Sequence, residues 1–233
     1  MSERGTNMAE EKLPLIVTID GPAGAGKSTI ARLVAEKIGL PYLDTGAIYR
    51  AIAWQLNEMN VGPEESPEML KLLADIKISF GLDTISVNGR DVTKEIRTPE
   101  TDKIVSAYAA LKCVRDALLS VQRAQAVKGL VADGRDMGTV VFPEAELKVF
   151  LTASAEERAK RRWKERVARG EKAVYDEILE QVNKRDDYDM HRTVAPLCPA
   201  QGSIILDSTE MTVDQVVDAI ASLAAEYRKP SPR

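Results

Sequence analysis

Cysteine and histidine are scarce in this sequence. The 233 residues include two cysteines, Cys113 and Cys198, and one histidine, His191. The two cysteines stand in no spacing typical of a metal site, a redox motif or a disulfide framework. We therefore interpret them as ordinary thiols and expect a cytoplasmic protein.

Long apolar runs and an excess of positive charge are also absent. No apolar stretch approaches the roughly 20 residues that cross a bilayer. Residues 1–12 are polar and lack the apolar region of a signal peptide, so we expect a disordered tail there. The net charge of −4 and the 5% aromatic content favour neither a nucleic-acid surface nor a membrane partner. Any anion site must therefore be built locally.

The sequence does contain an alternation of strand-like and helical segments. Its length is enough for one substantial core. Two capping boxes, Ser154 with Glu157 and Thr212 with Gln215, predict helix starts. The alternation predicts an α/β fold with a parallel sheet flanked by helices. Short runs typical of buried strands lie at residues 15–20, 130–133, 147–151 and 204–207.

Two regions depart from this alternation. Residues 77–92 contain two or three short strand-like pieces, one pair of them joined at Asn88-Gly89, which predicts a small antiparallel insert. Helical patterns follow at 99–108 and 111–127. Residues 158–172 are dense in arginine and lysine, and they suit either a solvated helix face or a mobile lid that closes over phosphates.

A glycine-rich segment with the pattern G-x-x-x-x-G-K-[ST] stands between the first predicted strand and the first predicted helix. In such a P-loop, backbone N–H groups and the helix N-terminus bind phosphate oxygens. Lys27 would reach the β- and γ-phosphates, and Ser28 would bind Mg²⁺. The predicted ATP-binding residues are Gly21, Pro22, Ala23, Gly24, Ala25, Gly26, Lys27, Ser28 and Thr29.

A P-loop alone does not say what receives the phosphate. The guanine-reading pattern N-K-x-D of a GTPase occurs at 183–186, but the apolar spacing around it is helical, which makes the match accidental. A kinase needs a second anion site opposite the P-loop, and several arginines beside turns, strand ends or aspartates are candidates for it.

The sequence resembles the bacterial cytidylate kinase family over about residues 15–222. The resemblance rests on an ordered set of separate motifs. These are residues 19–29, 43–50 (LDTGAIYR), 95–98 (EIRT), 132–143 (ADGRDMGTVVFP), 156–159 (EERA), Arg185-Asp186 with Asp189 and Arg192, 195–197 (APL) and 206–209 (LDST).

This resemblance implies a P-loop NTPase fold with a five-stranded parallel sheet, a β-rich insert and a helical lid. It implies a core of residues 13–48, 128–153 and 193–233. It also implies a nucleoside-monophosphate-binding part at 49–127, with the insert at about 77–98, and a lid with an acceptor-site helix at 154–192.

The resemblance further implies roles for individual residues. Arg158, Arg162 and Lys27 would stabilise the moving phosphoryl group, and Asp133 would orient water around Mg²⁺. The acceptor site would consist of Thr45 and Tyr49 lining the pocket, Arg50, Arg135 and Arg192 on the acceptor phosphate, Arg185 and Asp189 at the ribose, and Ser106, Arg115 and Asp136 at the cytosine edge.

The activity that the resemblance implies is Mg²⁺-dependent phosphorylation of CMP, and of dCMP, by ATP. We expect the protein to be a monomer. His191 has no role in that reaction, and Tyr42, Trp54 and Trp163 are interpreted as packing residues. Two alternatives stay open at this point. One is a P-loop kinase for a non-nucleotide acid such as shikimate, and the other is an NTP-dependent switch or nucleic-acid-binding module.

Overall fold

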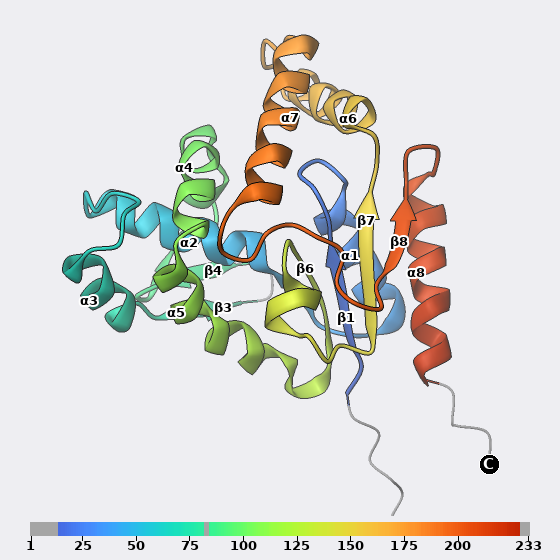
Figure 1. The fold of residues 1–233 in the computed structure, drawn as a ribbon, viewed down its shortest axis with the longest axis horizontal. Helices are drawn as coiled ribbons and strands as arrows, with labels where there is room; N and C mark the ends of the chain where they lie inside the picture. The colour runs from blue at the N-terminus through green and yellow to red at the C-terminus, as the bar shows by residue number, and fades with distance from the viewer. Residues whose placement is uncertain (1–13, 82–83, 229–233) are drawn as a thin grey trace, which may run out of the picture.

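The computed structural model describes residues 14–81 and 84–228, and the tail expected at residues 1–12 lies outside them (Figure 1). A five-stranded sheet in the order β2-β6-β1-β7-β8 forms the centre, and all its strand pairs are parallel. The strands are β1 (Ile16–Asp20), β2 (Tyr42–Asp44), β6 (Leu130–Gly134), β7 (Leu147–Thr152) and β8 (Ile204–Asp207). The predicted parallel sheet is confirmed.

Helices cover both faces of this sheet. Helices α1 (Lys27–Ile38) and α8 (Val213–Arg228) pack on the face that carries Val17, Ile19 and Val131. Helices α2 (Thr45–Glu58) and α5 (Lys112–Arg123) pack with Leu130 and Ala132 on the opposite face. Alternate residues of β6 therefore belong to different cores, as expected of a strand buried on both faces.

The predicted antiparallel insert is a three-stranded sheet in the order β3-β4-β5. Asn88 and Gly89 both have positive φ, 52° and 81°, as a two-residue hairpin turn requires. The strands are β3 (Ile78–Phe80), β4 (Ile85–Val87) and β5 (Arg90–Asp91), and the neighbouring elements are α3 (Pro67–Asp75), η1 (Glu95–Arg97), α4 (Pro99–Ala109) and η2 (Ala124–Lys128).

Helices α6 (Ala155–Ala168) and α7 (Tyr175–His191) form a projection above the strand ends, at the top of Figure 1. They are joined by a small apolar cluster of Ala159, Ile178 and Val182. Residues 158–168 of the arginine-rich segment are therefore helical, with an apolar face against α7, and residues 169–172 lie beyond the helix. Residues 183–186 lie inside α7, which confirms that they form no base-reading loop.

Only one of the two predicted capping boxes is reciprocal. Thr212 and Gln215 exchange hydrogen bonds of 2.8 and 3.3 Å. Ser154 accepts from the Glu157 N–H at 3.1 Å, but the Ser154 N–H donates to Thr209 instead. The Glu157 carboxylate is therefore left to bind Arg161.

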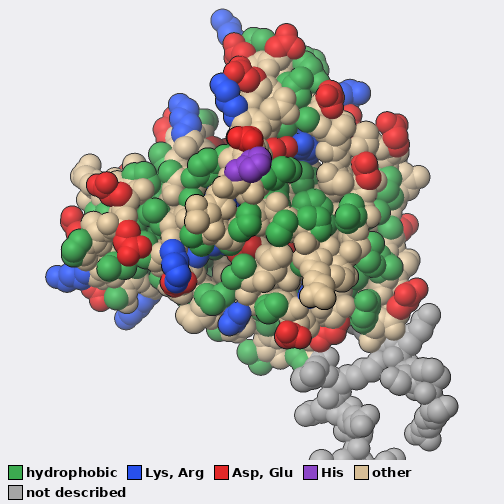
Figure 2. Space-filling view, in the orientation of Figure 1, with side chains coloured by type: hydrophobic (Ala, Val, Ile, Leu, Met, Phe, Trp, Pro, Cys, Tyr) green, Lys and Arg blue, Asp and Glu red, His purple; other side chains and the backbone are tan. Residues whose placement is uncertain are grey.

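The side chains on one face of the molecule are of mixed type, and the single histidine is on this surface (Figure 2). His191 is exposed, and its ring contacts the Asp187 carbonyl and carboxylate, away from the cavity described below. Across the described ranges, no helix combines the length and the hydropathy needed to cross a membrane.

Candidate active site

The P-loop connects the end of β1 to the start of α1, as the motif predicts. Gly24 and Gly26 have φ of 79° and 84°, a region that glycine enters without strain. A Cβ on Gly21 would stand 1.9 Å from the Leu151 carbonyl oxygen, so no side chain fits there. The loop therefore depends on glycine at each of these three positions.

Lys27 is buried at the first position of α1, and its Nζ donates to the Pro22 carbonyl at 2.8 Å. Burial lowers the pKa of Lys27 well below its usual value, and Arg135 and Arg185 add to the effect. Cations thus converge on Lys27, and the nearby carboxylates of Asp133 and Asp20 offset them only in part. An anion bound in the loop would restore the usual state of the lysine.

Asp133, at the end of β6, faces the start of α1. Its Oδ2 accepts from the Ser28 hydroxyl at 2.9 Å, and its Oδ1 accepts from the Tyr42 hydroxyl at 2.8 Å. Thr45 donates to the Asp133 carbonyl at 2.5 Å. The interpretation of Tyr42 as a packing residue missed its hydroxyl contact, because nothing in the sequence places Tyr42 beside Asp133.

The Ser28 hydroxyl and the Asp133 carboxylate are oxygen ligands of the kind that Mg²⁺ prefers. Burial raises the pKa of Asp133 to about 6, with Asp44 as the next cause. A divalent cation bound beside this buried carboxylate would stabilise its charged form. Within the described residues, no group of three or more His, Cys, Asp or Glu is arranged to hold a metal ion. An ion here would take most of its ligands from phosphates and water, as Mg²⁺ commonly does.

A cavity of about 1000 Å³ extends from the P-loop between α4, β6, α6 and α7. Its lining brings together most of the predicted site residues. These are Ala23, Gly24, Gly26, Lys27, Ser28, Thr29, Thr45, Tyr49, Arg50, Ser106, Arg115, Asp133, Arg135, Asp136, Arg162, Arg185, Asp189 and Arg192.

One end of this cavity is formed by an ion pair between Arg115 and Asp136, both of them buried. Arg115 also donates to the Ala109 carbonyl at 2.8 Å, and its guanidinium lies 5.1 Å from the centre of the Tyr49 ring. Ser106, on α4, is half-buried and lines the same cavity. The three residues predicted to read a cytosine edge therefore share one cavity, although they come from three segments.

Arginine side chains line the part of the cavity around Asp189. Arg135 donates to Asp189 at 3.0 Å, and Arg192 lies 3.9 Å from the other oxygen of Asp189. Arg185 Nε and Arg192 Nη2 are buried and have no hydrogen-bond partner in the described chain. Burial lowers the pKa of Arg185 to about 10, and Arg135, Arg50 and Arg162 lower it further. Guanidinium N–H groups that lack a protein partner, on residues that line one cavity, are suited to bind a phosphate.

Gly21, Pro22 and Ala25 of the P-loop do not line the cavity, and Arg158 is the one predicted site arginine that does not line it. Its three guanidinium nitrogens donate to Ala153, Ala23 and Asp186 at 2.9, 2.9 and 2.6 Å. In this conformation Arg158 ties the P-loop to α7. Arg161, which the sequence did not single out, lines the cavity instead, and it bonds to Glu157 and Ser208.

Asp20, the last residue of β1, has a buried carboxylate that lies against the backbone just after Asp136. It accepts from the N–H groups of Met137 and Gly138 at 2.9 and 2.8 Å, and so holds the turn η3 (Met137–Val141) that follows Asp136. Burial raises the pKa of Asp20 from 3.8 to about 6, although these two hydrogen bonds oppose the shift.

The raised pKa of Asp20 gives stability a definite pH dependence. Between about pH 4 and 6 the folded chain binds this proton more tightly than the unfolded chain, so the Asp20 contribution falls as pH rises through that window. At 1.36 kcal/mol per pKa unit the contribution is about 3 kcal/mol. Urea unfolding at pH 5 and pH 7 should therefore show wild type losing stability relative to Asp20→Asn at the higher pH. A difference between the two proteins that does not change with pH would contradict this assignment.

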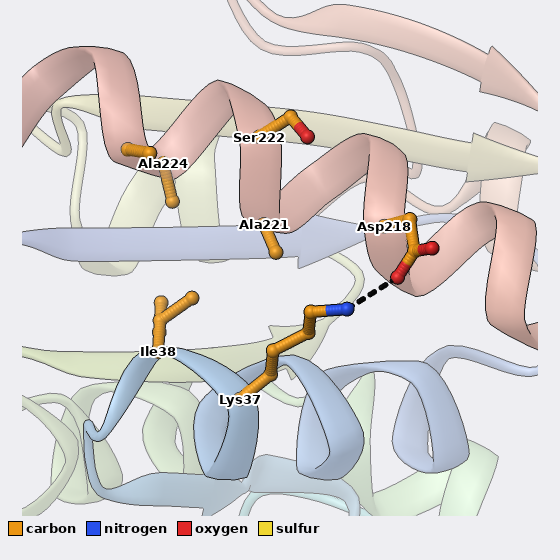
Figure 3. A pocket seen from close by; sticks show the side chains of 7 residues that line it. Lys37, Ile38, Asp218, Ala221, Ser222 and Ala224 are labelled. Carbon is orange, nitrogen blue, oxygen red and sulfur yellow. Dashed lines mark hydrogen bonds and ion pairs between the residues drawn. The ribbon is translucent and has the colours of Figure 1, made fainter.

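A second hollow of about 550 Å³ lies between α1 and α8 (Figure 3). Alanines and Ser222 line it, and an ion pair between Lys37 and Asp218 crosses it. It lies at the end of α1 opposite the P-loop, it lacks a concentration of like charge, and its one lysine is already paired. We assign no ligand to it.

The sheet order, the P-loop and the facing arginine-lined cavity define a P-loop protein of the nucleotide-binding, phosphoryl-transferring class. Comparison of sequences narrows this class to one family. A sequence model of the family described as cytidylate kinase matches residues 17–226. The chain belongs to the cytidylate kinase family.

Two curated relatives illustrate the likeness. A cytidylate kinase of Vibrio vulnificus is 48% identical over 208 residues, which are 87% of this chain and 92% of that protein. A cytidylate kinase of Geobacter sulfurreducens is 42% identical over 223 residues, 94% of this chain and 96% of that protein. Among solved structures, an uncharacterized protein from Eubacterium ventriosum aligns with a TM-score of 0.50 at 13% identity, covering 91% of this chain and 98% of that one. That last likeness concerns the fold alone.

Proposed function

We propose that this protein transfers the γ-phosphoryl group of ATP to CMP, forming ADP and CDP, and that it also accepts dCMP. The observation that carries the proposal is the single cavity that joins the P-loop to the buried Arg115–Asp136 pair. Family membership and the names of the two cytidylate kinase relatives support the same reaction.

Base selection is assigned to Asp136, Arg115 and Ser106. The exocyclic amino group of cytosine is a donor that a carboxylate such as Asp136 can accept. Arg115 and Ser106 would donate to the ring acceptors. Uracil presents an oxygen where cytosine has its amino group, so Asp136 would face an acceptor. A site built to bond one group can reject the analogue that lacks it by orders of magnitude.

The acceptor phosphate is assigned to Arg50, Arg135 and Arg192, and the ribose to Arg185 and Asp189. Thr45 and Tyr49 complete the wall of this acceptor site. The unpaired nitrogens of Arg185 and Arg192 support an anionic ligand in the middle of the cavity. Because the acceptor phosphate is already an anion, the reaction needs no general base, and catalysis consists of positioning and charge neutralisation.

The phosphates of ATP are assigned to residues 21–29, with Lys27 on the transferred group. Mg²⁺ bound with ATP would be held by Ser28 and, through water, by Asp133, and it would neutralise charge between the β- and γ-phosphates. Arg162 lines the cavity and would stabilise the moving phosphoryl group directly. Arg158 would join it if its bonds to Ala23 and Asp186 exchange on closure of α6 and α7.

The proposed working parts follow from these roles. Residues 13–48, 128–153 and 193–233 would form the ATP-binding core, residues 49–127 the acceptor-binding part, and residues 154–192 the lid and acceptor helix. Closure would exclude water, which otherwise competes for the phosphoryl group. We further propose that the protein is a monomer. We also propose that it acts in the cytoplasm, and the two unpaired cysteines support that reducing compartment.

Replacing Arg162 with alanine tests the lid. The expected result is a fall in kcat of about 10²-fold with little change in the KM for ATP or CMP, because the guanidinium acts on charge that develops in the transition state. Arg32→Ala, an exposed arginine of α1, is the control for loss of one positive charge. A rise in KM with unchanged kcat would reassign Arg162 to ground-state binding.

The reaction itself is tested with a coupled assay for ADP over CMP, dCMP, UMP, AMP, GMP and shikimate. The proposal predicts the highest kcat/KM with CMP, activity with dCMP, and a much lower value with UMP. Preference for AMP, GMP or shikimate would contradict it.

A further inference from the structure

The proposed reaction assigns no work to the Tyr42 hydroxyl, although it lies at the metal end of the site. It donates to Asp133 Oδ1 at 2.8 Å, while the Ser28 hydroxyl donates to Oδ2 at 2.9 Å. A phenol can only donate to an ionised carboxylate, and each oxygen of Asp133 has its own donor. Together the two bonds fix the rotation of the carboxylate about its own axis.

The strand register explains how Tyr42 reaches Asp133. Strand β2 pairs with β6 so that Tyr42 is opposite Val131 and Asp44 is opposite Asp133. Residues at positions i and i+2 share one face of a sheet, so these four side chains lie on the face that α1 covers. The Tyr42 ring packs against the apolar cluster of that face. The hydroxyl is thus presented from a rigid strand.

We propose that Tyr42 is a positioning residue for magnesium: its hydroxyl holds Asp133 turned toward Ser28, in the orientation that binds the water around the ion of MgATP. This rests on the proposed function, in which Ser28 and Asp133 serve the metal. Without the phenol, Oδ1 of Asp133 would lose its side-chain donor, and the remaining bond from Ser28 to Oδ2 would not by itself fix the rotation of the carboxylate. Tyr42 would therefore act on the ion indirectly, through its hydrogen bond to Asp133.

The test compares wild type with Tyr42→Phe by titration calorimetry. The probe is adenylyl imidodiphosphate, a non-hydrolysable ATP analogue, in the presence of Mg²⁺ and in the presence of EDTA. We expect the variant to bind the analogue about tenfold more weakly than wild type with Mg²⁺, and within twofold of wild type in EDTA. An unchanged affinity in both buffers, or an equal loss in both, would overturn the proposal.

Tyr108→Phe is the matched control. Tyr108 is a buried tyrosine of α4 whose hydroxyl donates to the Val61 carbonyl at 2.6 Å, so the same atom is removed away from the metal. Both variants should fold, which thermal unfolding without ligand verifies. A Mg²⁺-specific loss confined to Tyr42→Phe supports the assignment, and the same loss in Tyr108→Phe contradicts it.

The calorimetry also separates this inference from the proposed function. Wild type is assayed for CMP phosphorylation in parallel. If wild type binds the analogue with Mg²⁺ but does not phosphorylate CMP, the proposed acceptor is wrong, while the comparison of Tyr42→Phe with wild type still decides the role of Tyr42.

Discussion

Replacing Lys27 with alanine is expected to reduce kcat for ATP and CMP by about 10³-fold or more. Lys27 is the buried cation of the P-loop, and its Nζ is held by the Pro22 carbonyl at 2.8 Å. Bound phosphate would replace that carbonyl as its partner, and the lysine would neutralise charge on the transferred group. Steady-state kinetics in a coupled assay for ADP measure the effect.

Lys37→Ala provides the control for this prediction. Lys37 is on the same helix, is exposed, and pairs with Asp218 at the end remote from the P-loop (Figure 3). Its replacement should leave kcat within about twofold of wild type, since exposed ion pairs contribute little. Wild-type turnover by Lys27→Ala would show that the P-loop does not bind the reacting phosphate.

The second large effect is expected at Asp136. The substitution Asp136→Asn preserves the size of the side chain but removes its charge and replaces one of its two acceptor oxygens with an NH₂ donor, which weakens the proposed bond from the cytosine amino group. We expect kcat/KM for CMP to fall by about 10²- to 10³-fold while the KM for ATP stays close to wild type. The preference for CMP over UMP should shrink by a similar factor, because the new amide can donate a hydrogen bond to the uracil oxygen, which the carboxylate cannot do.

Stability must be measured beside these kinetics. Asp136 is paired with Arg115 in the interior, and removing one charge of a buried pair costs roughly 3–5 kcal/mol. Asp116→Asn is the matched control, because Asp116 is on the same helix as Arg115 but forms an exposed pair with Lys112. If kcat/KM fell equally for CMP and UMP in Asp136→Asn, Asp136 would have no role in selecting the base.

The parts of the fold that the sequence predicts well are those with a local physical signature. The P-loop is one, because glycine at positive φ, a strand before it and a helix after it are all visible in neighbouring residues. The hairpin at Asn88-Gly89 is another. Strand β2 was not found, because it is only three residues long and only Leu43 of the three is buried.

The parts that the sequence does not predict depend on contacts between distant residues. Tyr42 meets Asp133, 91 positions away, only because β2 pairs with β6 in a particular register. Arg158 and Arg162 are one helical turn apart, and the sequence alone predicts the same role for both. In the structure, however, Arg158 is buried and bonds to Ala23 and Asp186, whereas Arg162 lines the cavity. No spacing rule distinguishes two arginines whose partners come from other elements.

The most direct measurement is transfer of radiolabel from γ-³²P-ATP with CMP as the acceptor, followed by separation of the nucleotides. The account predicts that the label appears in CDP, that it depends on Mg²⁺, and that inorganic phosphate forms slowly when no acceptor is present. Label released as phosphate at the same rate with and without CMP, and none in CDP, would contradict it.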